Sequence, residues 1–527
     1  MSKKCVFYAS ILAVITIFLC TKILQAKKFE IFNPVSQTVA QSVWDEKTRV
    51  DRFDFACLMC NGIQIPVDTI EKTFYVPVNM ESDEWENMEF TSGNSEYQIV
   101  FWEDFTQHDK KDAIANAMDI EFLVYTDTEF STYHMIFTGL PIMDISTEQG
   151  IIDQKEISGY SAFYDTNFLT QGIQTSSYYG HVRGNTSTLY PKKGYKINLT
   201  KHEEDGTIVN NKLPIFGMRD DDDWLLYAIY NDESKMRAKL SIDLWNEFGA
   251  KEVSANSIYN TNMTYIELMV DNSYYGLYGI MERVDAKQMN LQPADYMYKY
   301  KETSEFSPEI FKESTNSETY VQGFELKEGI LDEDAWDPMS EISELYQASD
   351  EEFKEKVNDL IDEDNVIRLW LFTQLITGVD QSSKNVLYVA KKELDDYRFY
   401  FAPWDMDLTW GNISARVEPL YTIYNGELVK KAQHWQPGDR LIRLNVNGAA
   451  EKMQKLYGQM RQSAWSDEVL ITRILELDHI LRNSGAYLRD QKRWPEGAYA
   501  EDCSTLIDYA KQRMEYLDTA LYDLENY

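Results

Sequence analysis

The sequence has few cysteines and histidines, and it has far fewer basic than acidic residues. It contains five cysteines and six histidines, and 51 lysines and arginines stand against 87 aspartates and glutamates, which gives a net charge of −36. Nucleic-acid binding requires basic surface to displace counterions, so this charge argues against it. Metal ions and cationic partners are favoured instead. An aromatic content of 13% argues against a disordered chain.

The cysteines do not form a disulfide framework. Cys5 and Cys20 lie in an N-terminal apolar stretch, which leaves Cys57 and Cys60 as a C-x-x-C pair and Cys503 alone. A zinc site requires a second pair or neighbouring histidines, and the histidines form no H-x-H or H-E-x-x-H cluster. For Cys57 and Cys60, a local disulfide and plain buried thiols are the two interpretations.

Residues 1–26 have the pattern of a targeting segment. Lys3 and Lys4 precede the apolar run, and Leu24-Gln25-Ala26 is an imperfect small-residue cleavage site. The segment is therefore expected to be a cleaved signal peptide or a short N-terminal membrane anchor. Both alternatives place the rest of the chain outside the cytoplasm, and any membrane contact would run through this segment alone.

After the leader, the patterns predict an α+β chain of two units. Residues 27–150 hold β-branched and aromatic runs between polar turns, with one helix near Lys110–Met118, which is typical of a small β-rich accessory domain. Residues 151–527 mix strands and helices in an order that predicts two lobes, at about 151–290 and about 291–527, with a cleft between them. The strands expected in the first unit are Thr73–Val78, Tyr97–Trp102, Ile120–Tyr125 and Tyr133–Phe137.

The first half of the second unit has clear local signals. Gly194–Thr200 alternates as a strand should, with Lys196 on the face opposite Tyr195. A predicted hairpin, Tyr265–Val270 and Gly276–Met281, leads to Glu282, where a hinge between the lobes is expected. An apolar residue recurs every four positions in a helix that stops at Gly249. The residues of this stripe are Met236, Leu240, Leu244 and Phe248.

Two acidic segments interrupt this unit. Four adjacent carboxylates at Asp220–Asp223 are typical of a solvated loop, and a hard-cation site is the alternative. Residues 301–340 are polar and acidic, and we expect an insertion or a lid there. No chemistry is predicted for this second segment.

The most informative stretch is Leu375–Asn412, LITGVDQSSKNVLYVAKKELDDYRFYFAPWDMDLTWGN. Asp380 and Asn385 are five positions apart, two apolar runs of strand length follow, and Asp405 and Asp407 come next. In protein kinases an Asp orients the substrate hydroxyl, an Asn five positions later holds a metal ion, and another Asp beyond a hairpin holds the metal ions on the phosphates. The spacing predicts an acid and metal site, although H-R-D, D-F-G and G-x-G-x-x-G are absent. A pair of capped turns is the alternative.

Five sequence blocks, in their order, resemble the spore-coat protein H (CotH) kinase family. They are RGNTSTLYPKKGYKINL, DDDDWLLYAIYNDESKMRAKLSIDLWNEFGA, YYGLYGIMERVD, DQSSKNVLYVA and PWDMDLTWGN, and the resemblance covers about residues 160–525. It implies an atypical, reduced protein-kinase-like fold of two lobes. It also implies that ATP and Mg²⁺ or Mn²⁺ are used to phosphorylate protein Ser or Thr. The β-rich unit resembles the N-terminal region of some secreted bacterial members.

The resemblance assigns roles by position. Asp380 resembles the catalytic-loop Asp, while Asn385 and Asp405 resemble the metal ligands. Asp407 is the second acid of the family's W-D-x-D, and which of Asp405 and Asp407 is the main ligand stays open. The expected nucleotide contacts are Arg183, Lys196, Arg237 and Glu282, and Lys193 is the alternative to Lys196.

Two functions remain open at this point. The first is a protein kinase that is secreted or anchored at the cell surface or spore coat. The second is a non-catalytic surface or spore-coat protein that keeps the fold for binding, because a fold does not establish an activity. For the kinase, the acidic charge predicts a basic, Ser-rich protein substrate.

Overall fold

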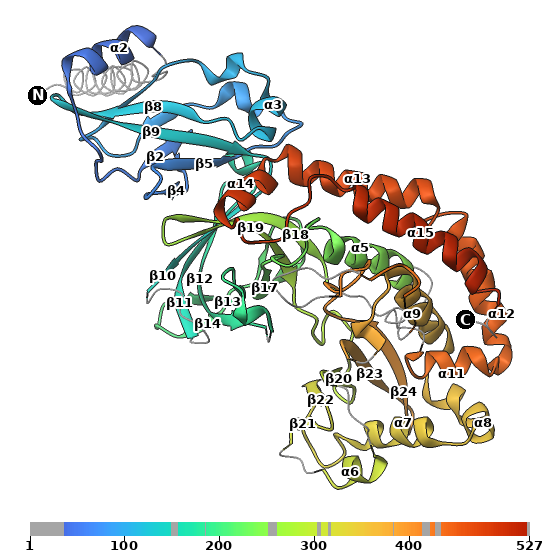
Figure 1. The fold of residues 1–527 in the computed structure, drawn as a ribbon. Helices are drawn as coiled ribbons and strands as arrows, with labels where there is room; N and C mark the ends of the chain where they lie inside the picture. The colour runs from blue at the N-terminus through green and yellow to red at the C-terminus, as the bar shows by residue number, and fades with distance from the viewer. Residues whose placement is uncertain are drawn as a thin grey trace, which may run out of the picture.

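The computed structural model describes residues 36–148, 156–184, 186–250, 261–302, 307–314, 318–382, 384–413, 422–426, 430 and 434–523. The expected leader at residues 1–26 lies outside these ranges. The described chain is a mixed α+β structure that begins with a β-rich unit, as expected from the sequence. A strand barrel follows, and then a second sheet with most of the helices (Figure 1). No helix in these ranges is long and apolar enough to span a membrane.

The β-rich unit is a sheet in the order β4-β5-β9-β8-β7, with β1 paired to β9. Apolar residues alternate along its strands, and Phe74, Phe122 and Tyr133 meet in its core. A small sheet, β3-β2-β6, and two helices complete the unit. Its elements are α2 Gln37–Glu46, β1 Thr48–Arg49, β2 Leu58–Cys60, β3 Ile63–Gln64, β4 Val67–Asp68, β5 Thr73–Pro77, β6 Phe90–Ser92, β7 Gln98–Phe101, α3 Lys110–Ala115, β8 Ile120–Tyr125 and β9 Glu129–Thr138.

The cysteines of this unit are free thiols, as is Cys503. Of the two interpretations of Cys57 and Cys60, the disulfide is therefore wrong. Cys60 is buried on β2, and burial raises the pKa of its thiol to about 12. Because the thiolate is the reactive form, Cys60 is a packing residue at neutral pH.

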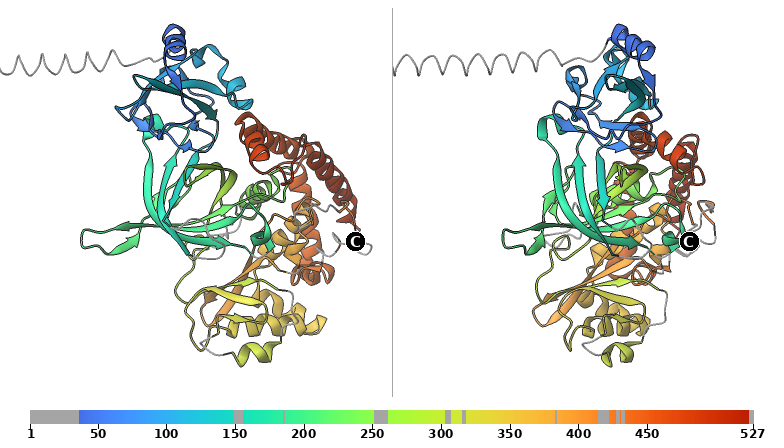
Figure 2. Two further views of the ribbon diagram at one scale, coloured as in Figure 1. Left: turned by 60° about the vertical axis from the view of Figure 1, so that its left-hand side comes forward. Right: turned by 90° about the vertical axis from the view of Figure 1, so that its left-hand side faces the viewer.

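The next strands close into a barrel. The sheet runs β12-β11-β10-β18-β19-β17-β13, and β12 also pairs with β13, so these strands form a ring with β14 attached to β13. Trp224, Tyr195 and Tyr278 are among its fully buried side chains, and closure removes the exposed edges of an open sheet. Figure 2 shows these long strands bending between the β-rich unit and the second sheet. The barrel strands are β10 Ile142–Thr147, β11 Glu156–Tyr164, β12 Gln174–Arg183, β13 Gly194–His202, β14 Ile208–Asn210, β17 Asp223–Tyr227, β18 Met263–Val270 and β19 Ser273–Glu282.

The barrel begins earlier in the chain than the sequence suggested. Strand β10 pairs with β11 and β18 and not with the β-rich sheet. Strand pairing therefore divides the chain between Thr138 and Ile142, before the expected boundary at residue 150. The reason is tertiary, because β10 has the same alternating pattern as the strands that precede it.

The second sheet runs β21-β22-β20-β23-β24 and shares one large core with helix α5 and the C-terminal helices. Helix α9 is central to this core, since all residues from Asn365 to Ile376 are buried. Its N-cap Asp362 accepts a hydrogen bond from the Asn365 amide. The elements are α5 Arg237–Ala250, β20 Tyr296–Tyr300, α6 Pro308–Lys312, β21 Tyr320–Val321, β22 Phe324–Glu328, α7 Asp337–Gln347, α8 Asp350–Leu360, α9 Glu363–Ile376, β23 Val386–Glu393, β24 Asp396–Pro403, α11 Gly438–Arg443, α12 Ala449–Arg461, α13 Asp467–Asn483, α14 Ala486–Arg493 and α15 Ser504–Ala520.

A buried polar network joins the β-rich unit, the barrel and helix α14. Arg489 of α14 donates two hydrogen bonds to Glu267 of β18, at 2.8 and 2.9 Å. The hydroxyl of Tyr274 also donates to Glu267, and the ring of Tyr274 stacks on Tyr75 of the β-rich unit with centroids 4.9 Å apart. Asp68 accepts a hydrogen bond from the Tyr274 amide. These contacts fix the three parts relative to one another.

Replacing Arg489 with methionine is expected to destabilise the protein by about 3–5 kcal/mol, because Glu267 then keeps a buried charge without its cation. The double variant Arg489→Met/Glu267→Met should recover most of that loss, since it removes both charges. Urea unfolding of both variants gives the comparison. Equal stability of the single variant and the wild type would contradict the structural role of this ion pair.

Candidate active site

Helix α9 delivers the loop that carries Asp380 and Asn385. The helix ends at Ile376, and its C-cap Thr377 adopts a left-handed conformation with φ of 52°. The Asn385 side chain donates a hydrogen bond to the Asp380 carboxylate at 3.2 Å. The Asn385 amide donates to Tyr300 of β20 at 2.8 Å. The neighbouring strand β20 therefore fixes the position of the metal-binding candidate.

The segment after β24 lies against this loop. The Trp404 amide donates to the Asn385 carbonyl at 2.8 Å, and the buried Gln381 side chain donates to the Trp404 carbonyl at 2.9 Å. Asp405 has a φ of 56°, which turns the chain out of the strand. Pairing of β23 with β24 thus brings residues 380–385 and 405–407 to the same edge of the sheet.

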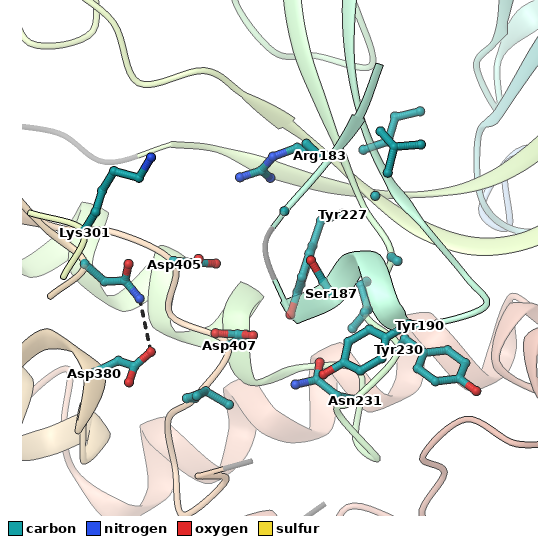
Figure 3. A pocket seen from close by; sticks show the side chains of 18 of the residues that line it. Arg183, Ser187, Tyr190, Tyr227, Tyr230, Asn231, Lys301, Asp380, Asp405 and Asp407 are labelled. Carbon is teal, nitrogen blue, oxygen red and sulfur yellow. Dashed lines mark hydrogen bonds between the residues drawn. The ribbon is translucent and has the colours of Figure 1, made fainter. Parts of the chain in front are cut away.

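Both segments open onto one large cavity between the barrel and the second sheet. Its volume is about 540 Å³, and Asp380, Asn385, Asp405 and Asp407 line it together with Arg183 of the barrel. Figure 3 shows the three carboxylates and Arg183 around this space. A smaller cavity of about 190 Å³ adjoins it, because both are lined by His181, Arg183, Lys299 and Lys327. One part of the wall of the smaller cavity is apolar and is formed by Leu225, Val284, Met297, Leu387 and Trp404, and the rest is basic and includes Lys196 and Arg283.

The carboxylates of the large cavity repel one another. Burial, with added repulsion from Asp405 and Asp380, raises the pKa of Asp407 well above its usual value. Burial also raises the pKa of Asp380, and the neighbouring Lys384 opposes that shift. The ammonium of Lys384 lies 3.2 Å from the Asp380 carboxylate. A divalent cation would relieve this crowding of negative charge.

These donors fit a metal ion that is shared with a ligand. Within the described ranges no group of three or more His, Cys, Asp or Glu side chains is arranged to hold a metal ion. Mg²⁺ is usually held by one or two carboxylates, water and the phosphates of its substrate. Asp405 and Asn385, with Asp407 deeper in the cavity, supply oxygen donors of that kind.

Comparison with known proteins decides the family. The model of the family described as CotH kinase protein matches residues 181–517, which is more than half of the chain. The chain belongs to the CotH kinase protein family. Over 192 residues it is 28% identical to the inner spore coat protein H of Bacillus subtilis (strain 168), and the alignment covers 35% of this chain. It covers 49% of that protein, so the chain spans about half the length of this relative.

Two of the expected nucleotide contacts of this CotH family member lie at the cavities. Arg183, at the end of β12, lines both of them. Lys196 of β13 reaches only the smaller cavity, where its ammonium lies 3.5 Å from the Asp223 carboxylate.

The other three expected contacts do not reach either cavity. The Lys193 ammonium donates to the Thr188 carbonyl at 2.5 Å. Arg237 is buried in an ion pair with Asp232, 2.5 Å away, so the expectation that it could reach a phosphate is wrong for this geometry. Glu282 is buried and accepts hydrogen bonds from the Arg219 amide and the Asn262 side chain. All three stabilise the backbone around the site.

The acidic run at Asp220–Asp223 is not a solvated loop. Asp221, Asp222 and Asp223 are buried. Asp221 pairs with Arg219 and Lys287, and Asp223 pairs with Lys196 and Arg283. The run therefore supplies counterions to basic residues near the end of β19, which explains why adjacent carboxylates are tolerated here.

Sequence patterns missed most of the basic side chains in the large cavity. Lys299 lies on β20, Lys301 directly follows it, Lys327 lies on β22, and Lys384 lies on the loop between Asp380 and Asn385. The segment at 301–340, for which no chemistry was expected, thus contributes directly to the site. The available signal was the alternation in Tyr296–Tyr300, YMYKY, which places Lys299 on the opposite face from Tyr298 and Tyr300.

Proposed function

We propose that this protein is an atypical protein kinase that acts outside the cytoplasm and transfers the γ-phosphate of ATP to Ser or Thr of a protein. In this proposal the barrel and the second sheet are the two lobes of a reduced kinase-like fold. One observation carries it: Asp380, Asn385, Asp405 and Asp407 share a cavity with basic side chains in a chain of net charge −36. A non-catalytic protein has no evident need for that combination.

The two cavities suggest how the nucleotide lies. The apolar part of the wall of the smaller cavity, which includes the ring of Trp404, suits a flat heteroaromatic base. The large cavity suits the phosphates, since Arg183, Lys301 and Lys384 line it. This orientation points the terminal phosphate toward Asp380.

Asp380 would act on the acceptor. Its carboxylate orients the Ser or Thr hydroxyl and accepts the hydroxyl proton as the oxygen attacks the γ-phosphorus. The bond from that phosphorus to the β,γ-bridging oxygen breaks, and ADP leaves. Burial raises the pKa of Asp380, which makes it a better proton acceptor, and the hydrogen bond from Asn385 holds its orientation.

Asp405 and Asn385 would hold a divalent metal ion against the phosphate oxygens, with Asp407 as a further acid. When bound, Mg²⁺ or Mn²⁺ neutralises charge that develops on those oxygens. The protein's own part is to fix the donors, and the hydrogen bonds of Trp404 and Gln381 do this by tying the two segments together.

Similarity and charge indicate the location and the substrate class. The similarity to an inner spore coat protein supports a spore-coat or cell-surface location, and the pattern of residues 1–26 supports export. The net charge of −36 supports a basic, Ser-rich protein as the acceptor. Phosphorylation of basic and acidic test peptides at low salt distinguishes this substrate class, and equal rates on both would remove the charge argument.

The direct test is transfer of labelled γ-phosphate by the chain from residue 27 onward, with Mn²⁺ or Mg²⁺. Label is expected on the protein itself or on a basic Ser-rich protein, and none is expected from Asp380→Ala. No transfer by the wild type with either metal would reject the kinase.

Removal of the metal ion should remove nucleotide binding. With ATP at 100 times its Kd, mass action raises the unfolding free energy by about 2.7 kcal/mol. We expect that stabilisation with Mg²⁺ or Mn²⁺ and its loss in EDTA, because the phosphates then face Asp405 and Asp407 without a cation. Thermal unfolding with and without ATP measures it, and an equal shift in EDTA would contradict the metal site.

A non-catalytic spore-coat protein is the second candidate. The name of the similar Bacillus subtilis protein favours it, and in this candidate the β-rich unit ahead of the barrel serves as a binding module. This candidate predicts neither a metal-dependent ATP shift nor transfer. The two experiments above therefore separate it from the kinase.

A further inference from the structure

The basic side chains around the two cavities divide into paired and unpaired groups. The arginines and lysines that line them are Arg183, Lys196, Arg283, Lys299, Lys301, Lys327 and Lys384. Lys301 and Lys327 pair with Glu325, Lys384 pairs with Asp380, and Lys196 and Arg283 pair with Asp223. The side chains of Arg183 and Lys299 make no hydrogen bond or ion pair with any residue in the described ranges. Within the described part of the chain, these two cations therefore have no carboxylate at ion-pair distance, although the protein is rich in carboxylates.

An unpaired positive charge on Lys299 destabilises the folded protein. Burial lowers the pKa of its ammonium to about 8, and the positive charge of Arg183 adds to the shift. Its nitrogen lies 5.0 Å from the centre of the Trp404 ring, so the aliphatic stem follows the wall of the smaller cavity. Asp405 is the group that favours the charged form. Two like charges facing one cavity destabilise each other until an anion enters.

The position of the pair matches an elongated anion. Arg183 and Lys299 both line the large and the small cavity, so they stand at the junction of the two. Arg183 comes from β12 of the barrel and Lys299 from β20 of the second sheet. An anion held between them would contact both halves of the site. The guanidinium adds the planar, forked donor geometry that phosphate oxygens accept.

We propose that Lys299 and Arg183 form the polyphosphate-binding pair of this protein, and that Lys196 is not part of it. The identity of the anion as the triphosphate of ATP rests on the proposed function, whereas the anion site does not. Lys196 is excluded because its ammonium is already paired with Asp223, and Asp223 is itself held by Arg283 at 2.8 Å. Lys196 instead links β13, through Asp223, to Arg283 at the end of β19.

Lys299→Met and Lys196→Met are matched variants for the test. Each keeps an unbranched apolar side chain and removes one ammonium at the smaller cavity. Isothermal titration calorimetry with inorganic tripolyphosphate and with ATP and Mg²⁺ measures anion affinity at pH 7. We expect Lys299→Met to weaken tripolyphosphate about 10- to 100-fold, as for loss of one charge-assisted hydrogen bond. Lys196→Met should stay within about 3-fold of the wild type.

Thermal unfolding without ligand is a second measurement, in which Lys299→Met is expected to lose no stability although it loses affinity. Lys299→Met should melt at the same temperature as the wild type or higher, because it removes a desolvated charge that repels Arg183. Weaker binding of a variant that melts at a lower temperature would signal damage to the fold and would overturn the assignment. Rescue of tripolyphosphate binding by Lys299→Arg, which restores a cation, would support it.

The outcomes separate this inference from the kinase proposal. An equal or larger loss of affinity in Lys196→Met than in Lys299→Met overturns the pair, as does a wild type that binds no tripolyphosphate. A wild type that binds tripolyphosphate through Lys299 but neither binds ATP nor transfers phosphate supports the anion site and overturns the kinase. If the wild type transfers phosphate and Lys299→Met binds tripolyphosphate as tightly as the wild type, the kinase is supported and the Arg183–Lys299 pair is overturned.

Discussion

Replacing Asp380 with asparagine is expected to lower the rate of phosphate transfer by about 10²- to 10⁴-fold, the range for loss of a general base. Asparagine has the same size and can still accept the hydrogen bond from Asn385. It cannot accept the proton of the acceptor hydroxyl. Folding should be unharmed, because the change removes one of three carboxylates that repel one another. The measurement is kcat with labelled ATP and a basic Ser-rich protein.

Two controls make the Asp380 result specific. Asp396→Asn changes an exposed aspartate at the start of β24, outside both cavities, and should transfer phosphate at the wild-type rate. Asp380→Asn should still show the metal-dependent stabilisation by ATP, because Asp380 acts on the acceptor and not on the metal ion. Wild-type turnover by Asp380→Asn would remove this residue from the mechanism.

Replacing Asp405 with alanine is expected to abolish both transfer and the stabilisation by ATP. A carboxylate that holds the metal ion against the phosphates contributes to binding and to the transition state, so its loss should cost several kcal/mol, about 10³-fold in rate. Asp405 is exposed at the cavity, whereas Asp407 lies deeper, which favours Asp405 as the main ligand. Titration with Mn²⁺ at fixed ATP measures the change in metal dependence.

Asp407→Ala is the matched variant for this experiment. If Asp405 is the main ligand, Asp407→Ala should need more Mn²⁺ for half-maximal activity but retain transfer at high metal concentration. Full activity in Asp405→Ala, with Asp407 intact, would assign the metal ion to Asp407 instead. Both variants should remain folded in urea unfolding, since each removes part of a repulsive cluster.

The acidic part of the site could be predicted because it depends on local chain geometry. Asp380 and Asn385 lie on one short loop after a buried helix, and a hairpin of two adjacent strands returns the chain to Asp405. Neighbouring strands joined by a tight turn pair with each other, so the spacing alone predicts that these side chains meet. The structure confirms the helix, the two strands and the shared cavity.

The basic part could not be predicted in the same way. Arg237 and Lys193 looked available in the sequence, but groups five residues earlier in the chain, the Asp232 carboxylate and the Thr188 carbonyl, occupy them. For Lys299, the sequence shows only that it lies on one face of an alternating strand. No residue near it in the sequence indicates that its ammonium stays unpaired. A carboxylate from another strand decides whether a lysine is neutralised, as Asp223 does for Lys196.

The sequence by itself determined the α+β class, the family and the spacing of Asp380, Asn385, Asp405 and Asp407, because periodicity, turns and short loops express interactions between residues close in the chain. Only the tertiary structure decided that the β strands of residues 142–282 close into a barrel, that β10 belongs to it, and that Arg183 and Lys299 meet at one junction. Those outcomes depend on which distant strands pair and on which charges these strands bring together. Strand pairing between distant segments is determined by burial across the whole chain and not by any local pattern.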